Sequence, residues 1–359
     1  MGEVLTSGQI GGRRNIVING AMNVAQRSAS VTGIGASAGY FTLDRWNIAT
    51  GASAGRLTMT QTADGPNGVS ANCLKLDCTT ADTSIAAGEN LILQQSFEGQ
   101  DLQAIGKGVT GAKEVTLSFY VKANAAFDFV AEWQDNDHSR VVSKLFATTT
   151  DWVRHEITFP ADVDDGSSPF DDDNANSAAL NFWLHGGTTF TSGTLGTTWH
   201  ETAANRAAGI DSFYSSTDNN FFITGVQLEV GSQATPFENR SFGEELALCQ
   251  RYYHHIQGSA KSKIAKGHAT DARAGYFNIE LPTSMRHTYT LVHSGVSTLR
   301  WVVEANSETV AQSFSLSDSN TLDIASVYMQ HANNVTTVGY ACGITLIDAN
   351  AYIAFDAEL

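Results

Sequence analysis

Residues 221–230, FFITGVQLEV, form the pattern that decides the fold class. Apolar and polar side chains alternate with a period of two, which is typical of a sheet strand with one buried face. A strand of this kind is expected to close the first domain. Its buried face is expected to hold Phe222, Val226, Leu228 and Val230, and its other face Ile223, Gln227 and Glu229.

The pattern changes its period after residue 240. Ser241 and Glu244 have the spacing of a capping box, which predicts a short linking helix over residues 241–257. Apolar residues in this segment follow one another at spacings of four, three, four and three, as in a narrow coiled-coil seam. A helix this short is marginal alone, so the seam needs a partner, either at a symmetric oligomer axis or on its own domain. The seam consists of Phe242, Leu246, Cys249, Tyr253 and Ile256.

The composition favours an all-β protein with two domains. Only 16% of the 359 residues are charged, and 32 are glycine, which suits many short strands joined by turns. The formal net charge of -16 argues against nucleic-acid binding, because phosphate contacts need clusters of Lys and Arg. No apolar run is long enough to predict a membrane span, and the first residues lack the apolar core of a signal peptide.

The order of patterns along the chain predicts four parts. Residues 1–14 are expected to form an N-terminal arm, and residues 15–240 a jelly-roll β-sandwich of about ten strands, including a short strand at 15–19. Residues 26–39, QRSASVTGIGASAG, are expected to form a loop. After the linking helix at 241–257, residues 258–359 are expected to form a second, smaller β domain.

Five segments are distinctive enough to compare with known families. They are GGRRNIVINGAMNVAQR (11–27), FTLDRWNIA (41–49), VTLSFYVKA (115–123), ITGVQLEVGSQATPFENRSFGEELALCQRYYH (223–254) and AYIAFDAEL (351–359). These segments resemble those of bacteriophage tail-fibre and related virion receptor-binding proteins, in which a jelly roll similar to a carbohydrate-binding module is joined to a C-terminal β domain. The resemblance implies a virion protein made in the bacterial cytoplasm, a homotrimer, attachment to other virion proteins through the N-terminal arm, and binding to a host-surface glycan without membrane insertion.

Strand alternation also predicts a carbohydrate-binding face. Trp183 lies between Asn181 and His185 on the side opposite the expected core, and large aromatic rings left at a surface usually meet a partner. Sugars would stack on such rings while neighbouring amides and charges bond their hydroxyl groups. The same alternation leaves open that a neighbouring protomer or the second sheet covers this face. The expected platform is Tyr120, Glu132, Arg154, Asn181 and Trp183.

Other chemistry is less well supported by the sequence. The pentapeptide GASAG occurs twice, but each copy precedes a strand pattern, whereas a hydrolase nucleophile elbow needs a helix there. Glu132 and Glu156 are expected on one polar face, which keeps a polysaccharide-cleaving enzyme as an alternative. The acidic residues 162–176 offer oxygen ligands that suit Ca²⁺, but their spacing fits no EF-hand, so a solvated loop is favoured and no metal or cofactor site is assigned.

The favoured hypothesis is thus a non-enzymatic phage tail fibre or spike protein that binds cell-surface carbohydrate. A structural decoration or connecting protein of the capsid or tail, without a ligand, is the second hypothesis. A polysaccharide-cleaving enzyme is the third.

Overall fold

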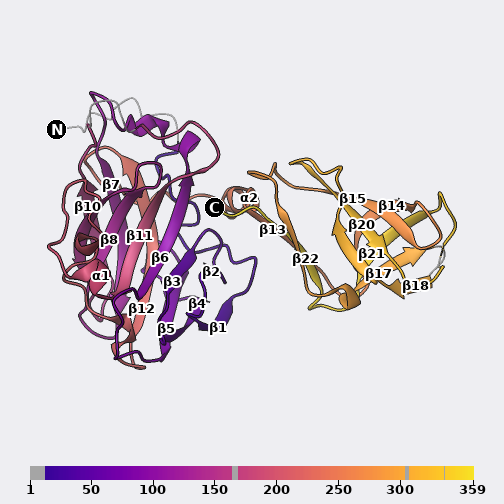
Figure 1. Ribbon diagram of the computed structural model, residues 1–359, viewed down its shortest axis with the longest axis horizontal. Helices are drawn as coiled ribbons and strands as arrows, with labels where there is room; N and C mark the ends of the chain where they lie inside the picture. The colour runs from indigo at the N-terminus through magenta and orange to yellow at the C-terminus, as the bar shows by residue number, and fades with distance from the viewer. Residues whose placement is uncertain (1–12, 164–168, 304–306, 335) are drawn as a thin grey trace. The chain divides into compact units, whose positions relative to one another are not determined.

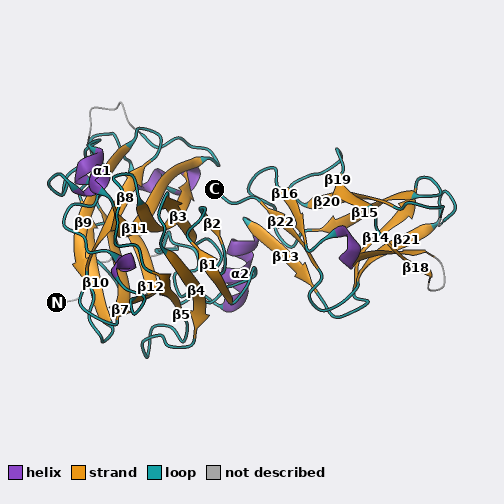
Figure 2. Ribbon diagram, turned by 60° about the horizontal axis from the view of Figure 1, so that its bottom comes forward, coloured by secondary structure: helices purple, strands orange, loops and turns teal. Residues whose placement is uncertain are grey.

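The computed structural model describes residues 13–163, 169–303, 307–334 and 336–359 (Figure 1). Most of its regular structure is antiparallel strand, and Figure 2 shows how few helical turns interrupt it. The chain separates into two compact units, one ending at Glu245 and also containing Leu359, and one spanning Leu246–Glu358. The all-β prediction is confirmed. Residues 1–12 of the predicted N-terminal arm lie outside the described residues.

The N-terminal unit is built from two six-stranded sheets. Sheet A contains, in spatial order, β1 (Ser30–Ile34), β4 (Arg56–Thr62), β5 (Cys73–Thr80), β12 (Asn220–Val230), β7 (Val115–Ala123) and β10 (Val153–Phe159). Sheet B contains β2 (Gly39–Tyr40), β3 (Asn47–Gly51), β6 (Asn90–Glu98), β11 (Asn176–Gly186), β8 (Asp128–Asp135) and β9 (Arg140–Ala147). The short helical segments of this unit are α1 (Thr188–Thr191), η1 (Gly99–Asp101), η2 (Gln103–Ile105), η3 (Ala203–Asn205) and η4 (Phe213–Ser215).

The core of this unit lies between the two sheets. Phe119 of sheet A meets Phe182 of sheet B with 5.1 Å between ring centroids, so the inner faces interdigitate as in a β-sandwich. Alternate residues of β7, β8 and β11 belong to one apolar cluster, as expected of strands with one buried face: Val115, Leu117, Phe119, Val121, Phe129, Ala131, Trp133, Leu180, Phe182 and Leu184.

The phase of β12 differs from the prediction in its first half. Phe221 and Ile223 are buried in the core, whereas Phe222 is half-buried on the outer face. Val226 and Leu228 point inward as expected. The register slips around Gly225, whose φ is 61°, and a bulge of one residue exchanges the two faces of a strand.

The linking helix is shorter than predicted. Helix α2 spans Phe242–Gln250, and Ser241 Oγ accepts a hydrogen bond from the Glu244 amide at 3.3 Å, so the predicted start is confirmed. The predicted end at residue 257 is wrong, because β13 spans Tyr253–Gln257 and pairs with β22. The YYHHI run is aromatic and β-branched, and such residues favour strands over helices.

The predicted oligomer seam is therefore broken. Phe242, Leu246 and Cys249 lie on α2, but Tyr253 and Ile256 lie on β13. Cys249 is fully buried and Phe242 is exposed, so these residues do not share one surface stripe. A continuous helical seam cannot gather copies of this chain.

Two further expectations for the N-terminal unit are wrong. Residues 15–19 form no strand; instead, the Ile16 amide donates to the Leu228 carbonyl and Asn15 bonds back to β12 through its side chain. The segment expected as a loop contains β1, which pairs with β4 through a bulge near Gly33, whose φ is 77°.

The C-terminal unit contains two further antiparallel sheets. Sheet C contains β13, β22 (Tyr352–Asp356) and β16 (Thr290–His293). Sheet D contains β18 (Ser307–Val310), β17 (Leu299–Val303), β21 (Ala341–Leu346), β14 (Lys263–Ala269), β15 (Ala274–Glu280), β20 (Ile324–Gln330) and β19 (Ser313–Leu316). The turn η5 (Val296–Thr298) precedes β17. The core of this unit includes Trp301.

All four cysteines are free and buried: Cys73, Cys78, Cys249 and Cys342. Burial raises the pKa of Cys73 and of Cys78 to about 11 in each case. Within the described ranges, no helix is both long and apolar enough to cross a bilayer.

Candidate functional site

The five residues predicted to form one carbohydrate platform lie on two opposite outer faces of the sandwich. Tyr120 on β7 and Arg154 on β10 belong to sheet A and face each other in register. Glu132, Asn181 and Trp183 belong to sheet B. The prediction of one shared platform is wrong, because alternation fixes the face of a side chain but not the sheet that its strand joins.

The sheet B group is buried beneath the connection that leads from β11 to β12. Glu132 is fully buried, and its carboxylate accepts hydrogen bonds from Arg206 Nε at 2.9 Å and Nη2 at 2.6 Å. Asn181 Nδ2 donates to Glu132 and to Gln134, at 2.8 Å in each case. These polar groups satisfy one another, as buried polar groups must. They offer no free partner to a ligand.

Trp183 belongs to a small apolar cluster on the outer side of sheet B. Its ring lies 5.0 Å from the ring of Phe190, and the Arg206 guanidinium lies over it at 5.0 Å. Ile92, Val130 and Ala207 complete the cluster. Trp183 is 1% exposed, so the expected surface ring is covered, and the cover is the chain's own connection, neither a neighbouring protomer nor the second sheet.

His185 is buried next to this cluster. Its Nδ1 lies 2.8 Å from Ser212 Oγ, and its Nε2 lies 3.3 Å from Glu89 Oε2. Burial lowers the pKa of His185, and Glu89 partly offsets that effect. The side chain therefore has a structural role beneath the connection.

The carboxylate pair considered for glycoside hydrolysis is not a pair. Glu132 lies on β8 of sheet B and Glu156 on β10 of sheet A, so the expectation of one shared polar face is wrong. The two groups cannot flank one sugar ring at the roughly 5–10 Å that glycosidases require. Glu132 is also committed to Arg206.

The outer face of sheet A carries a row of aromatic and cationic side chains. Phe222 and Trp152 meet edge to face with 6.3 Å between centroids, and Lys122 lies over both rings at 4.8 and 5.2 Å. Arg154 pairs with Glu156 and donates to the Thr235 carbonyl. Both rings are half-buried and contact the Lys122 ammonium group, so this row is packed against its own cation.

An open pocket lies at one edge of the sandwich, around Trp199. Residues 196–200 extend the edge of β9, because Val141 and His200 exchange backbone hydrogen bonds at 2.8 and 2.9 Å. This pairing brings Trp199 next to Arg140. The Trp199 pocket has a volume of about 400 Å³ and is lined by Arg140, Pro160, Ala161, Asp162, Val163, Thr198 and Trp199.

The polar groups of the Trp199 pocket are held in fixed positions. Trp199 Nε1 donates to the Pro160 carbonyl at 2.9 Å, which fixes the half-buried indole. Arg140 Nη1 donates to both oxygens of Asp162, at 2.9 and 2.7 Å, and its guanidinium lies 5.9 Å from the Trp199 ring. Thr198 is exposed at the rim. The pocket thus combines an aromatic ring, a guanidinium, a carboxylate and a hydroxyl.

A buried lysine contacts two of the residues that line this pocket, Asp162 and Trp199. Lys107 Nζ lies 2.6 Å from Asp135 and 3.2 Å from Asp162, and its side chain is 1% exposed. The rings of Phe170 and Trp199 lie 5.3 and 5.6 Å from the same ammonium group. Two carboxylates and two rings surround the Lys107 ammonium group. Lys107 therefore fixes the position of Asp162 in the wall of the pocket.

Sequence reasoning missed Trp199 entirely. The residue lies in TSGTLGTTWHE, a segment without periodicity, and its partners come from residues 140 and 160–163. The one available signal was an aromatic residue inside a polar, glycine-rich loop.

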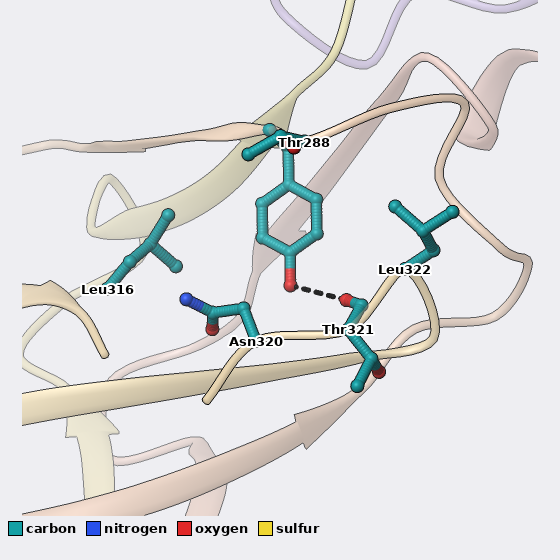
Figure 3. Close-up of a pocket in the computed structure, with 6 residues that line it drawn as sticks. Thr288, Leu316, Asn320, Thr321 and Leu322 are labelled. Carbon is teal, nitrogen blue, oxygen red and sulfur yellow. Dashed lines mark hydrogen bonds between the residues drawn. The ribbon is translucent and has the colours of Figure 1, made fainter. Parts of the chain in front are cut away.

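A second pocket lies in the C-terminal unit and is smaller, at about 180 Å³ (Figure 3). Tyr289 lines it, and its hydroxyl donates to the carbonyls of Thr321, at 3.0 Å, and Ile324, at 3.2 Å. Asn320 is engaged with the Ser317 carbonyl and the Ser326 amide. These polar atoms hold the loop before β20, so the pocket is mainly structural.

The described residues contain no group of three or more His, Cys, Asp or Glu side chains that could hold a metal ion. Part of the acidic stretch considered for Ca²⁺, residues 164–168, lies outside them.

No family model and no curated protein matches the sequence. Among solved structures, the chain is similar to a CBM4 structure at 12% identity, covering 59% of this chain and 97% of that one, with a TM-score of 0.31. It is similar to the family 11 carbohydrate-binding module of a Clostridium thermocellum cellulosomal cellulase at 14% identity, covering 58% and 99%, with a TM-score of 0.29. The enzymatically active domain of bacteriophage CBA120 tailspike protein 4 matches at 12% identity, covering 60% and 21%, with a TM-score of 0.32. Likeness at this level assigns no function to the chain.

Proposed function

We propose that the protein binds carbohydrate without cleaving it, and that the Trp199 pocket holds the sugar. The observation that carries the proposal is a fixed indole beside an Arg140–Asp162 pair in an open pocket of about 400 Å³. Small-molecule sites usually measure roughly 300–1,000 Å³ and combine apolar walls with a few convergent polar groups. One or two sugar rings fit that volume.

The chemistry of the pocket matches the two kinds of surface on a sugar. The apolar face of a pyranose ring packs on an indole, as other flat apolar groups do. The ring hydroxyls then reach Arg140, which donates and is oriented by Asp162, and Thr198, which donates or accepts. Because the pocket is open and shallow, one site binds weakly.

The non-enzymatic part of the proposal rests on the carboxylates. Glu132 is paired with Arg206 and buried, and Asp162 is held by Arg140 and Lys107. A glycosidase needs two carboxyl groups across one sugar ring, and Asp162 supplies the one carboxylate among the described residues that line the Trp199 pocket. Release of reducing ends from a polysaccharide by the purified protein would overturn this part.

The pocket assignment is tested by glycan binding to the full-length protein. Trp199→Ala should weaken binding to surface polysaccharides at least tenfold, because it removes the stacking ring, whereas Trp199→Phe should keep part of the affinity. Trp152→Ala is the matched control: this indole is also half-buried and donates to a backbone carbonyl, that of Asp64 at 3.0 Å, but it lines no part of the Trp199 pocket. Loss of binding in the Trp152 variant alone would place the site on sheet A.

The proposed setting is a phage virion, in which the protein attaches the particle to its host. The support is the sequence resemblance of residues 11–27 and 223–254 to tail-fibre proteins. Several copies on one particle would raise the effective concentration of weak sites. Light scattering should give the mass of a trimer; a monomer with no affinity for host cells would favour the alternative of a decoration or connecting protein.

A further inference from the structure

The outer face of sheet D gathers aromatic and cationic side chains. Phe277, Val327 and Ile344 point into the core of the C-terminal unit, so their neighbours along β15, β20 and β21 point outward. We use the name basic face for the outward residues Lys263, Lys266, His268, Tyr276, Asn278, Arg300 and Tyr328.

Two tyrosines form the centre of the basic face. Tyr276 and Tyr328 lie directly opposite each other on β15 and β20, with 5.2 Å between ring centroids and 50° between ring planes. Tyr276 is 39% exposed. Small residues flank the pair in the same cross-strand row, namely Ser315 on β19 and, beyond His268, Ala341 on β21. Tyr276 is thus exposed and Tyr328 half-buried, so solvent reaches the pair.

Two cationic residues lie beside this tyrosine pair, and two more lie further along the sheet. His268 is opposite Tyr276 in register, and Lys266 is its diagonal neighbour, opposite Asn278. Lys263 and Arg300 both pair with Thr345 in the cross-strand register, on the same outer face. Within the described parts of the chain, none of Lys263, Lys266 and Arg300 forms an ion pair or a side-chain hydrogen bond.

Among the described side chains, carboxylates are fewer at this face. Glu280 lies opposite Ile324, in the cross-strand row that also holds Lys263 and Arg300. Asp271 and Arg273 lie near Tyr328: burial raises the pKa of Tyr328, Asp271 raises it further and Arg273 lowers it. These two opposite charges offset each other, so among the described side chains the three cations Lys263, Lys266 and Arg300 outnumber the carboxylate of Glu280.

We propose that the basic face binds an acidic oligosaccharide, one that carries carboxylate groups on some of its sugar rings. Sugar rings would pack on Tyr276 and Tyr328, and the carboxylates would accept hydrogen bonds from Lys266 and Arg300. Asn278 and His268, which neighbour both Tyr276 and Lys266, would bond sugar hydroxyls. Charge-assisted bonds of this kind are about twice as strong as neutral ones.

Charge complementarity singles out this ligand within the chain. Residues 246–359 carry seven Lys and Arg against nine Asp and Glu, whereas residues 1–245 carry 14 against 28. An acidic ligand is therefore repelled least by the C-terminal unit. A duplex nucleic acid is a poorer fit, because its affinity comes from many phosphate contacts and three cations supply few.

The inference shares with the proposed function the premise that the ligand is a carbohydrate, but it concerns a different unit and a different sugar chemistry. The probes are immobilised polygalacturonate, alginate, hyaluronate and polysialic acid, with neutral dextran and duplex DNA for comparison. The full-length protein should be retained on at least one acidic polysaccharide, and less so as salt rises, because salt screens exposed charges.

Three variants test the face itself. Lys266→Gln combined with Arg300→Gln, and separately Tyr276→Ala, should each reduce binding to the retained polysaccharide about tenfold. Lys261→Gln is the matched control, because Lys261 is an exposed lysine in the turn before β14, outside the basic face, and it should bind normally. Retention on none of the acidic polysaccharides, equal loss with Lys261→Gln, or tighter binding to DNA would overturn the inference.

The Trp199→Ala variant separates the two proposals. Loss of acidic binding in Trp199→Ala, with normal binding in the Lys266 and Arg300 double variant, would overturn this inference and support the Trp199 pocket. The reverse pattern would support the basic face and count against the pocket.

Discussion

The two units of this chain use their charged residues in different ways. In the N-terminal unit, charges are built into the packing: Lys107 and Asp135 are both almost fully buried, and Arg206 reaches Glu132 under the cover of sheet B. In the C-terminal unit, Lys263 and Lys266 are exposed and form no ion pair with described residues. Lys107 and Arg206 therefore stabilise the packing of their unit, whereas Lys263 and Lys266 remain available to a ligand.

A buried histidine of the N-terminal unit and a half-buried histidine of the C-terminal unit also differ in how well their polar atoms are satisfied. His185 of the N-terminal unit has Ser212 and Glu89 as partners. His254 of the C-terminal unit stacks on Phe355, and its Nδ1 has no hydrogen-bond partner among the described residues. The His254 imidazole is therefore the less well satisfied of the two.

The largest expected effect comes from one substitution made in both units. Lys107→Met should lower the free energy of unfolding of the N-terminal unit by about 3–5 kcal/mol, because it removes the buried ammonium group that pairs with both Asp135 and Asp162. Lys266→Met should change the stability of its own unit by less than about 0.5 kcal/mol, as exposed substitutions do. Urea denaturation followed by tryptophan fluorescence is suitable, since five of the six Trp residues lie before residue 246. Similar losses of unfolding free energy in the Lys107 and Lys266 variants would contradict this difference between the two units.

Acidification should destabilise the C-terminal unit through His254. Burial, followed by the neighbouring His255, lowers the pKa of His254 from 6.5 to about 4. The unfolded chain therefore binds more protons between these pH values, so stability is complete above pH 6.5 and falls as pH drops toward 4. The full penalty is about 3 kcal/mol.

Hydrogen exchange of the β13 and β22 amides measures this effect. His254→Gln should flatten the pH dependence of the opening free energy between pH 6.5 and 4. An unchanged slope in the variant would mean that another group carries the pH dependence.

The bulge in β12 gives an effect of intermediate size. A Cβ at position 225 would lie 2.7 Å from Val69 Cγ1 and 3.0 Å from Tyr120 Cδ2, at a φ of 61°. Gly225→Ala should therefore cost about 1–3 kcal/mol in the N-terminal unit, measured by urea denaturation. Gly88→Ala is the control, because a Cβ at position 88 would have no neighbour within 4 Å and the φ of Gly88 is ordinary. Equal stability of the two variants would contradict the bulge.

The smallest effect concerns helix α2, which contains the sequence boundary between the two units. Ser241→Ala removes the cap of α2 and should cost about 1 kcal/mol of helix stability, visible as faster exchange of the first helical amides. Ser232→Ala, at an exposed serine in the preceding loop, should leave exchange in α2 unchanged. If both variants exchange alike, the Ser241 hydroxyl is not the cap.

Much of the fold could be predicted from the sequence, because period-two patterns are local. The core faces of β7, β8 and β11 follow from alternation alone. The helix end was missed because the apolar spacing continues into Tyr253–Gln257, where pairing with β22 decides the structure. Pairing with a partner about 100 residues away leaves no local signal.

The candidate site was less predictable for two physical reasons. The sheet that a strand joins is set by long-range pairing, so Arg154 and Glu132 were placed together although their strands lie in different sheets. What covers a sheet face is decided by irregular segments, such as the one that carries Phe190 and Arg206 over Trp183. Trp199 was missed because it also lies in a segment without hydrophobic periodicity.

The four buried thiols make the protein convenient to label. A thiol whose pKa is about 11, as for Cys73 and Cys78, is almost entirely protonated at neutral pH and reacts slowly with maleimides. Cys249 and Cys342 are shielded by burial as well. A single cysteine introduced at an exposed position would therefore carry a fluorophore selectively, without removal of the natural ones.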